Sequence, residues 1–193
     1  MNGKTAGLSV FLLAMPGERE LGARVLTVKS VSDEVTVADL GAPAEELAAA
    51  EHAGANVLRI PWENSFAAVK NVCMERASGR WVLFLHQNEF FDPKSWGSLG
   101  TLLRNPNAEG YMVFAGYRSV SSPVQSLRLV RRRPEYRFRY RSFEAFPEML
   151  LTGVAESHLT IQNGSAGENT WEYETRSLSL IHISEPTRPE RIS

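Results

Sequence analysis

Apolar and polar positions in the first half of the chain alternate between short strand-like runs and helix-forming segments. The apolar runs predict strands in LSVFLLAM (8–15), SDEVTVAD (32–39), VLRI (57–60) and WVLFL (81–85). Helices are predicted for AEELAAAEHA (44–53) and FAAVKNVCMERA (66–77), which end before Gly54 and Gly79. A succession of strand, helix, strand, helix and strand is typical of a wound parallel sheet flanked by helices.

The pattern also predicts a helix start and several later elements. Asn64 is the predicted N-cap of the second helix. A further helix is predicted from 92 to about 103, and another strand from 111 to 117. Aromatic and arginine residues alternate strictly over 136–141, which predicts a strand with its aromatic side chains inward and its arginines outward.

Polar residues follow three of the predicted strands. The first strand leads to Glu18, the second ends on Asp39, and the strand over 81–85 runs into HQNE (86–89). Because ligands bind at the carboxyl ends of the strands in open α/β sheets, we expect these three ends to converge on one site.

Five segments carry strings that match a known pattern. They read MPGE (15–18), DLGAPA (39–44), IPWENSFAAVKN (60–71), GRWVLFLHQNE (79–89) and LRLVRRRPEYRF (127–138). They resemble, in order, the strings K-N-E, D-T-G-S-T-D, F-P-W-N-x-D-F-x-x-A-R-N, G-D-W-I-L-x-L-D-A-D-E and R-L-F-R-N-R-P-x-x-R-F of the family 2 glycosyltransferases. The resemblance covers about residues 8 to 144 and implies a GT-A fold, a Rossmann-like and mostly parallel sheet flanked by helices.

The resemblance implies a metal site after the strand over 81–85. In the family, two aspartates there hold Mn or Mg, which offsets the charge of the departing nucleoside diphosphate. Here His86 and Asn88 replace both aspartates, and Glu89 follows them. We assign these three residues to the metal and the diphosphate, although the loss of two carboxylates lowers the expected affinity for a hard cation. The alternative is that the loop residues make only structural hydrogen bonds.

Other residues correspond to nucleotide contacts of the family. Asp39 matches an aspartate that contacts the base or ribose, and Glu18 is retained from K-N-E. Lys70 and Asn71 match the A-R-N positions, where a cation would approach the diphosphate. The alternatives are a turn or cap for Asp39 and a solvated helix face for Lys70 and Asn71.

An inverting transferase needs a base that deprotonates the acceptor hydroxyl. Glu144 is the candidate, because the family often has H-E at this place and RSFE (141–144) keeps the acid. An ordinary surface glutamate is the alternative. The arginines of 128–141 fit a solvated strand face first, a phosphate site second and nucleic acid a distant third.

Composition fits one domain with a sizeable core, since the 193 residues are 43% hydrophobic and 22% charged. The net charge of −1 gives no field that would attract nucleic acid or an anionic membrane. Cys73 is the single cysteine, which excludes an internal disulfide and suits a reducing compartment. The apolar run at 8–15 is too short to span a bilayer. We expect a cytoplasmic protein, with a place close to a membrane left open.

The end of the chain differs in character from the rest. LSLIHISEPTRPERIS (178–193) resembles the translation of a sequencing adapter, so we expect it not to be native sequence. A disordered tail containing proline and serine is the alternative. We therefore divide the chain into a GT-A-like domain over 1–177, incomplete at its C-terminus, and this tail.

Two functions remain open. The first is transfer of a sugar from a UDP- or GDP-sugar to an unknown acceptor with inversion. The second is an inactive pseudo-transferase that binds nucleotide sugars or serves as a scaffold. The replaced aspartates favour the second, whereas the retained Asp39, Glu89 and Glu144 favour the first.

Overall fold

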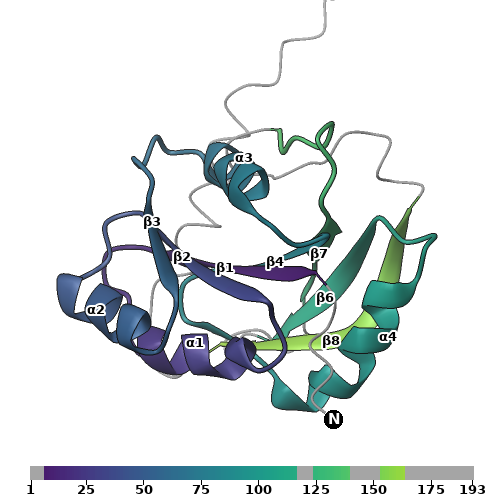
Figure 1. Ribbon diagram of the computed structural model, residues 1–193, viewed down its shortest axis with the longest axis horizontal. Coiled ribbons are helices and arrows are strands. Elements are labelled where there is room, and N and C mark those ends of the chain that lie inside the picture. The colour runs from purple at the N-terminus through teal and green to yellow at the C-terminus, as the bar shows by residue number, and fades with distance from the viewer. Residues whose placement is uncertain (1–6, 117–123, 140–152, 164–193) are drawn as a thin grey trace, which may run out of the picture.

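The computed structural model describes residues 7–116, 124–139 and 153–163. They form one eight-stranded mixed sheet in the order β3-β2-β1-β4-β7-β6-β8-β5. Helices flank the sheet on both faces (Figure 1). The α/β architecture expected from the sequence is therefore confirmed.

The first half of the sheet is parallel. Its strands are β3 (Asn56–Arg59), β2 (Glu34–Asp39), β1 (Leu8–Ala14) and β4 (Trp81–Leu85). They are joined through α1 (Leu21–Lys29), α2 (Ala44–His52) and α3 (Phe66–Arg76). This half reproduces the predicted alternation of strands and helices, with the addition of α1.

The second half of the sheet is mixed. It contains β5 (Glu89–Phe91), β6 (Gly110–Gly116), β7 (Val124–Arg131) and β8 (Val154–Asn163). The β7 strand pairs antiparallel with both β4 and β6, β8 runs parallel to β6, and β5 closes the far edge antiparallel to β8. A 3-10 turn (Pro93–Ser95) and α4 (Trp96–Arg104) follow β5, where a helix was predicted.

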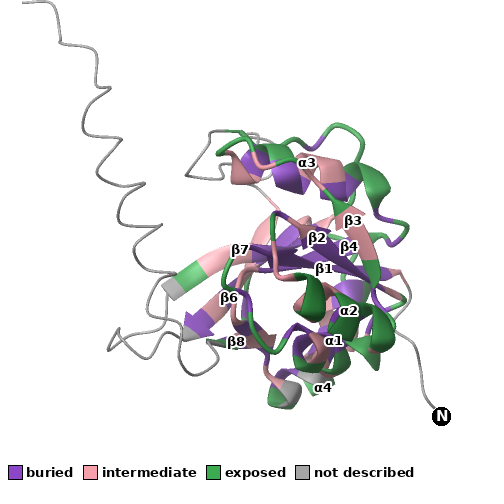
Figure 2. Ribbon diagram, turned by 90° about the vertical axis from the view of Figure 1, so that its left-hand side faces the viewer, coloured by how far each residue is buried: buried purple, intermediate pink, exposed green. Residues whose placement is uncertain are grey.

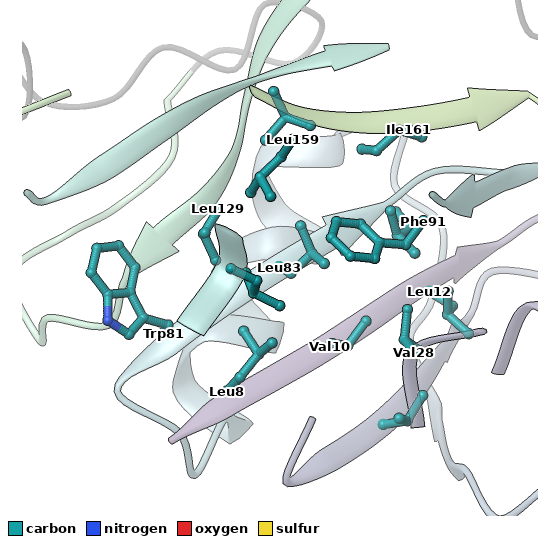
Figure 3. Packing of buried hydrophobic residues seen from close by; sticks show 14 of the residues in the cluster. Leu8, Val10, Leu12, Val28, Trp81, Leu83, Phe91, Leu129, Leu159 and Ile161 are labelled. Carbon is teal, nitrogen blue, oxygen red and sulfur yellow. The ribbon is translucent and has the colours of Figure 1, made fainter. Parts of the chain in front are cut away.

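Two hydrophobic cores lie on opposite faces of the sheet. Alternate residues of β1 supply them, with Val10 and Leu12 in one core and Phe11 and Leu13 in the other. The larger core contacts α1, α2 and α4, and Figure 3 shows its packing. The smaller core lies under α3 and includes the predicted core residue Cys73. In Figure 2 β1, β2 and β4 are mostly buried, β3 at the edge of the sheet is intermediate or exposed, and the helices expose their outer faces.

Local contacts at their two ends explain where α2 stops and where α3 begins. Gly54, just after α2, has a φ of 90°, a conformation that side chains disfavour, and its carbonyl accepts a hydrogen bond from Lys29 at 2.8 Å. At the start of α3 the prediction was wrong by one residue. Ser65 is the N-cap and its hydroxyl accepts from the Ala68 N–H at 3.2 Å, while Asn64 lies just before it with a φ of 55°.

The strand predicted for 136–141 is also wrong over its described part. Residues 136–138 form no strand, and Arg139 makes only an isolated bridge. The expected alternation of burial is nevertheless present, because Tyr136 and Phe138 are buried and Arg137 is exposed. The aromatic rings pack into the smaller core without a strand.

Candidate functional site at the carboxyl edge of the sheet

The carboxyl ends of the parallel strands meet at one edge, as predicted. Ala14 at the end of β1 lies opposite Asp39 at the end of β2, and Asp39 lies opposite Arg59 at the end of β3. On the other side of β1, Leu12 lies opposite Leu85, the last residue of β4. The loops after these strands therefore lie side by side, at the point where the chain order of the strands reverses between β1 and β4.

Asp39 shapes the turn after β2. Its Oδ1 accepts hydrogen bonds from the backbone N–H groups of Gly41 at 2.9 Å and Ala42 at 3.0 Å. Its Oδ2 lies 4.0 Å from the Nε of Arg59, whose side chain is 87% exposed. Asp39 thus makes a local turn with one oxygen and presents the other beside an exposed cation. The turn interpretation is confirmed, and contact of Asp39 with a nucleotide stays a prediction.

Glu89 is placed differently, because its carboxylate is buried inside the loop after β4. One oxygen accepts from the His86 backbone N–H at 2.6 Å, and the other pairs with Arg128 on β7 at 2.9 Å. Breaking a buried pair of this kind costs about 3–5 kcal/mol, because the remaining charge lacks compensation. Glu89 therefore stabilises the loop and attaches it to the second half of the sheet.

Arg24 is a second buried cation beneath the same loop. It lies on α1, and its guanidinium donates to the backbone carbonyls of His86 and of Glu89, the latter at 2.9 Å. It also forms a buried ion pair with Glu18. One side chain thus joins the loop after β1 to the loop after β4.

Glu18 lies where the sequence predicted, after β1, but it faces inward. Its side chain is fully buried against Arg24. Burial raises the pKa of Glu18, and the ion pair and hydrogen bond with Arg24, together with backbone hydrogen bonds from Asn88 and Arg19, oppose that rise. The predicted contact with a nucleotide would require this side chain to leave Arg24.

His86 belongs to a row of aromatic rings at the same edge. Its ring stacks on Phe66 with centroids 5.5 Å apart, and Trp62 meets Phe66 edge-on at 4.9 Å. Its Nε2 is buried and has no hydrogen-bond partner among the described residues. Burial, followed by the positive charges of Arg128, Lys70 and Arg24, holds the pKa of His86 well below its ordinary value. The imidazole is therefore neutral near pH 7.

Lys70 and Asn71 do not form the solvated helix face that the sequence left as an alternative. The Lys70 ammonium is buried 5.2 Å from the Phe84 ring centroid and 5.4 Å from that of Phe138. The Asn71 amide donates to the Phe138 carbonyl at 3.1 Å and accepts from its N–H at 2.7 Å. Both side chains hold the segment around Phe138 against the sheet. Whether either contacts a nucleotide stays a prediction.

The arginines at the end of β7 and after it make contacts within the fold. Arg131 lies 4.6 Å from the Trp81 ring centroid, and Arg133 forms two hydrogen bonds with the Glu109 carboxylate at 2.7 and 3.0 Å. Arg137 pairs with Glu75 at 3.1 Å. These contacts support a structural role for the segment. Glu144, the predicted base, lies outside the described residues, as does the predicted tail over 178–193.

The metal ligands predicted at this edge do not form a metal site as they stand. No group of three or more His, Cys, Asp or Glu side chains within the described ranges is arranged to hold an ion. The buried Nε2 of His86 would suit a metal, but the Glu89 carboxylate is already held by Arg128 and by the loop backbone. Asn88, with a φ of 57°, offers only a neutral amide.

Arg24 was the main residue that the sequence analysis missed. It shares the buried face of α1 with Leu21, Val25 and Val28. An arginine on an otherwise apolar helix face indicates a buried partner, and this signal could have been read from the sequence. The pairing of Arg128 with Glu89 had no comparable signal, because it joins strands 39 residues apart.

Comparison with solved structures identifies the fold. The chain is similar to glucosyl-3-phosphoglycerate synthase from Mycobacterium tuberculosis in complex with Mn²⁺, UDP and phosphoglyceric acid. The TM-score is 0.68 at 17% identity, over 94% of this chain and 80% of that chain. A complex of this synthase with Mg²⁺ and UDP gives a TM-score of 0.67 at 16% identity, over 93% and 79%. The fold is therefore that of the GT-A glycosyltransferases.

Comparison by sequence gives a more limited result. The chain is 34% identical over 137 residues to a TPR repeat-containing protein of Synechococcus elongatus, a match that covers 69% of this chain. It spans about a third, 34%, of the length of that relative. No family model matches the chain.

Within the described residues, no helix is long and apolar enough to cross a membrane.

Proposed function

We propose that this chain is a glycosyltransferase domain of the family 2 type, which takes a sugar from a UDP- or GDP-sugar and transfers it to an acceptor with inversion. The observation that carries the proposal is the carboxyl edge of the parallel strands, where Asp39 presents one carboxylate oxygen beside the exposed Arg59. The GT-A fold supports it, because structures that share this fold hold UDP. We place the protein in the cytoplasm.

Asp39 is the proposed nucleoside contact. A carboxylate at a strand end accepts hydrogen bonds from ribose hydroxyls or base N–H groups. Because the turn uses only Oδ1, Oδ2 can accept from a ligand without loss of the turn. The proposed surface contacts for the diphosphate are Arg59, the last residue of β3, and the exposed Arg19, on the loop after β1.

Glu144 remains the proposed base for the acceptor hydroxyl. Inversion requires the acceptor oxygen to attack the anomeric carbon from the side opposite the departing diphosphate, while a base removes its proton. The Glu144→Gln variant should keep nucleotide affinity and lose transfer, since the amide cannot take the proton. Lost nucleotide binding in this variant would instead assign Glu144 to folding or donor binding.

The direct test is calorimetric titration of the protein with UDP and with GDP, followed by a donor-hydrolysis assay with the matching nucleotide sugars. Saturable binding of one nucleotide, weakened in Asp39→Asn, is the expected result. No binding of either would contradict the proposal. Glu51→Gln, an exposed change on α2, is the matched control.

An inactive scaffold or nucleotide-sugar sensor is the second candidate. It is favoured by the burial of Glu18 and Glu89, whose carboxylates are engaged with Arg24 and Arg128 in place of a ligand. The two candidates differ in turnover. Nucleotide binding without hydrolysis of any bound donor, in the presence of a range of acceptors, would favour the sensor.

A further inference from the structure

We infer that this site binds a nucleoside diphosphate without a divalent cation, and that two buried arginines, Arg24 and Arg128, hold the loop after β4 where a metal would otherwise organise it. The inference rests on the proposed function for the identity of the ligand. It rests on the contacts of this loop for the absence of a metal requirement.

The first step concerns the carboxylate. Mn and Mg prefer anionic oxygen ligands, and Glu89 is the acid of the loop. Both of its oxygens already have donors, from the His86 N–H at 2.6 Å and from Arg128 at 2.9 Å. The side chain is 1% exposed. To bind a metal, Glu89 would have to abandon a buried ion pair and a backbone bond that shapes the loop.

The second step concerns the backbone oxygens. The carbonyls of His86 and Glu89 could otherwise serve as neutral ligands, but both accept hydrogen bonds from the Arg24 guanidinium. A divalent cation bound to these oxygens would lie next to a fixed positive charge. In a buried setting the repulsion between such charges is large, because the local dielectric is low.

The third step concerns the ligands that remain. They are the imidazole of His86, stacked flat on Phe66, and the Asn88 amide. Both are neutral. Two neutral ligands on one loop are a poor set for a hard cation, which needs several oxygens and gains most of its affinity from carboxylates.

The arginines supply order rather than net charge at this edge, because Arg24 pairs with Glu18 and Arg128 pairs with Glu89. Arg24 and Arg128 approach the same loop from α1 and from β7, and their positions are fixed by burial and by hydrogen bonds. A loop held in this way needs no reorganisation when a ligand binds. Since both are enclosed, they are positioning residues, and Arg19 and Arg59 remain the proposed direct contacts for the diphosphate.

The experiment has two parts, and both use the full chain. In the first, the protein alone is titrated with Mn²⁺ and followed by electron paramagnetic resonance of the free ion. In the second, UDP and GDP are titrated by calorimetry in EDTA and again in Mn²⁺. We expect no stoichiometric Mn²⁺ binding, and nucleotide dissociation constants that agree within about tenfold between the two conditions.

Opposite results would overturn the inference. One Mn²⁺ bound per chain, or nucleotide binding tightened by about tenfold or more in Mn²⁺, would mean that the loop rearranges into a metal site. If neither nucleotide binds under either condition, the proposed function fails. The Mn²⁺ titration of the protein alone then still decides whether a metal site exists.

The Glu89→Gln variant separates the two roles of the carboxylate. If Glu89 serves the loop, this variant melts at a lower temperature than Glu51→Gln, and Mn²⁺ affects its nucleotide affinity no more than that of the original chain. If Glu89 is a metal ligand, the melting temperature stays unchanged and a stimulation by Mn²⁺ is lost. The wild-type titrations decide the question even if this variant fails to fold.

Discussion

The turn after β2 and the loop after β4 occupy the same edge of the sheet and each carries an acidic residue, yet they are built in different ways. The Asp39 carboxylate accepts from the backbone N–H groups two and three residues later in the chain, and its second oxygen takes no part in the turn. Glu89 is held by an arginine from β7 and faces inward. The comparison teaches that one carboxylate oxygen can shape a turn while the other stays outside it, whereas a carboxylate that is also engaged by an arginine from a distant strand faces the interior.

The largest expected effect comes from removing the cation that joins the loops after β1 and β4. Arg24→Met should lower the free energy of unfolding by about 3–5 kcal/mol, because it leaves the buried Glu18 without its partner. Urea denaturation measures the change. Arg76→Met, an exposed change on α3, should have almost no effect. Equal stability of the two variants would show that the loop after β4 does not depend on Arg24.

Asn71 tests whether a predicted nucleotide contact belongs with the buried group. Asn71→Ala should cost about 1–3 kcal/mol of stability, since the backbone N–H and carbonyl of Phe138 both lose their partner. Asn71→Asp should cost less, because it still accepts from the N–H. Thermal melts compare the two variants. A stable Asn71→Ala protein with weakened nucleotide binding would place Asn71 with Asp39 instead.

Asp39→Asn tests the proposed nucleotide contact of the carboxylate oxygen that the turn does not use. The amide oxygen of Asn can still accept from Gly41 and Ala42, so the melting temperature should change little. Nucleotide affinity should fall by about tenfold, or ~1.4 kcal/mol, because an anionic acceptor is lost. Calorimetry with UDP or GDP checks this. Unchanged affinity in a folded variant would reduce Asp39 to a turn residue.

The smallest effect concerns the neutral imidazole of the loop after β4. Because the folded-state pKa of His86 lies below the ordinary 6.5, the unfolded chain binds the proton more readily. The contribution of His86 is therefore present above about pH 6.5 and lost as pH falls toward the folded pKa, at no more than ~1.4 kcal/mol per pH unit. Urea titrations across this range should show a weaker pH dependence in His86→Phe, which keeps the stacking on Phe66. The exposed His52→Gln is the control. An identical pH dependence in His86→Phe would contradict the assignment.

The sequence predicts features that depend on neighbours along the chain. The strand ending on Asp39, the helix before Gly54 and the polar residues at the end of β4 are all confirmed. In contrast, α1 has no local N-cap: Glu20 has a φ of 56°, and the first N–H of the helix is satisfied by Glu46 of α2 at 2.8 Å. Such a start leaves no local signal, because the partner comes from another helix.

The same limit applies to the candidate site. The position of Glu89 could be predicted, since it follows an apolar strand. The direction of its side chain could not, because that depends on Arg128, which arrives from a strand inserted antiparallel beside β4. Sequence patterns locate residues on an edge, but contacts between distant segments decide whether a residue faces a ligand or the interior.

The contacts of Arg24 and Arg128 also make the loop after β4 depend on distant parts of the chain. Arg24 reaches the Glu89 backbone across 65 residues, and Arg128 reaches its carboxylate across 39. Arg128 belongs to β7, which is not one of the four parallel strands. A chain that has assembled only the parallel strands therefore lacks the ion pair between Arg128 and Glu89 that holds the loop after β4. Ligand binding at this edge would then report that the whole sheet, including β7, has been completed.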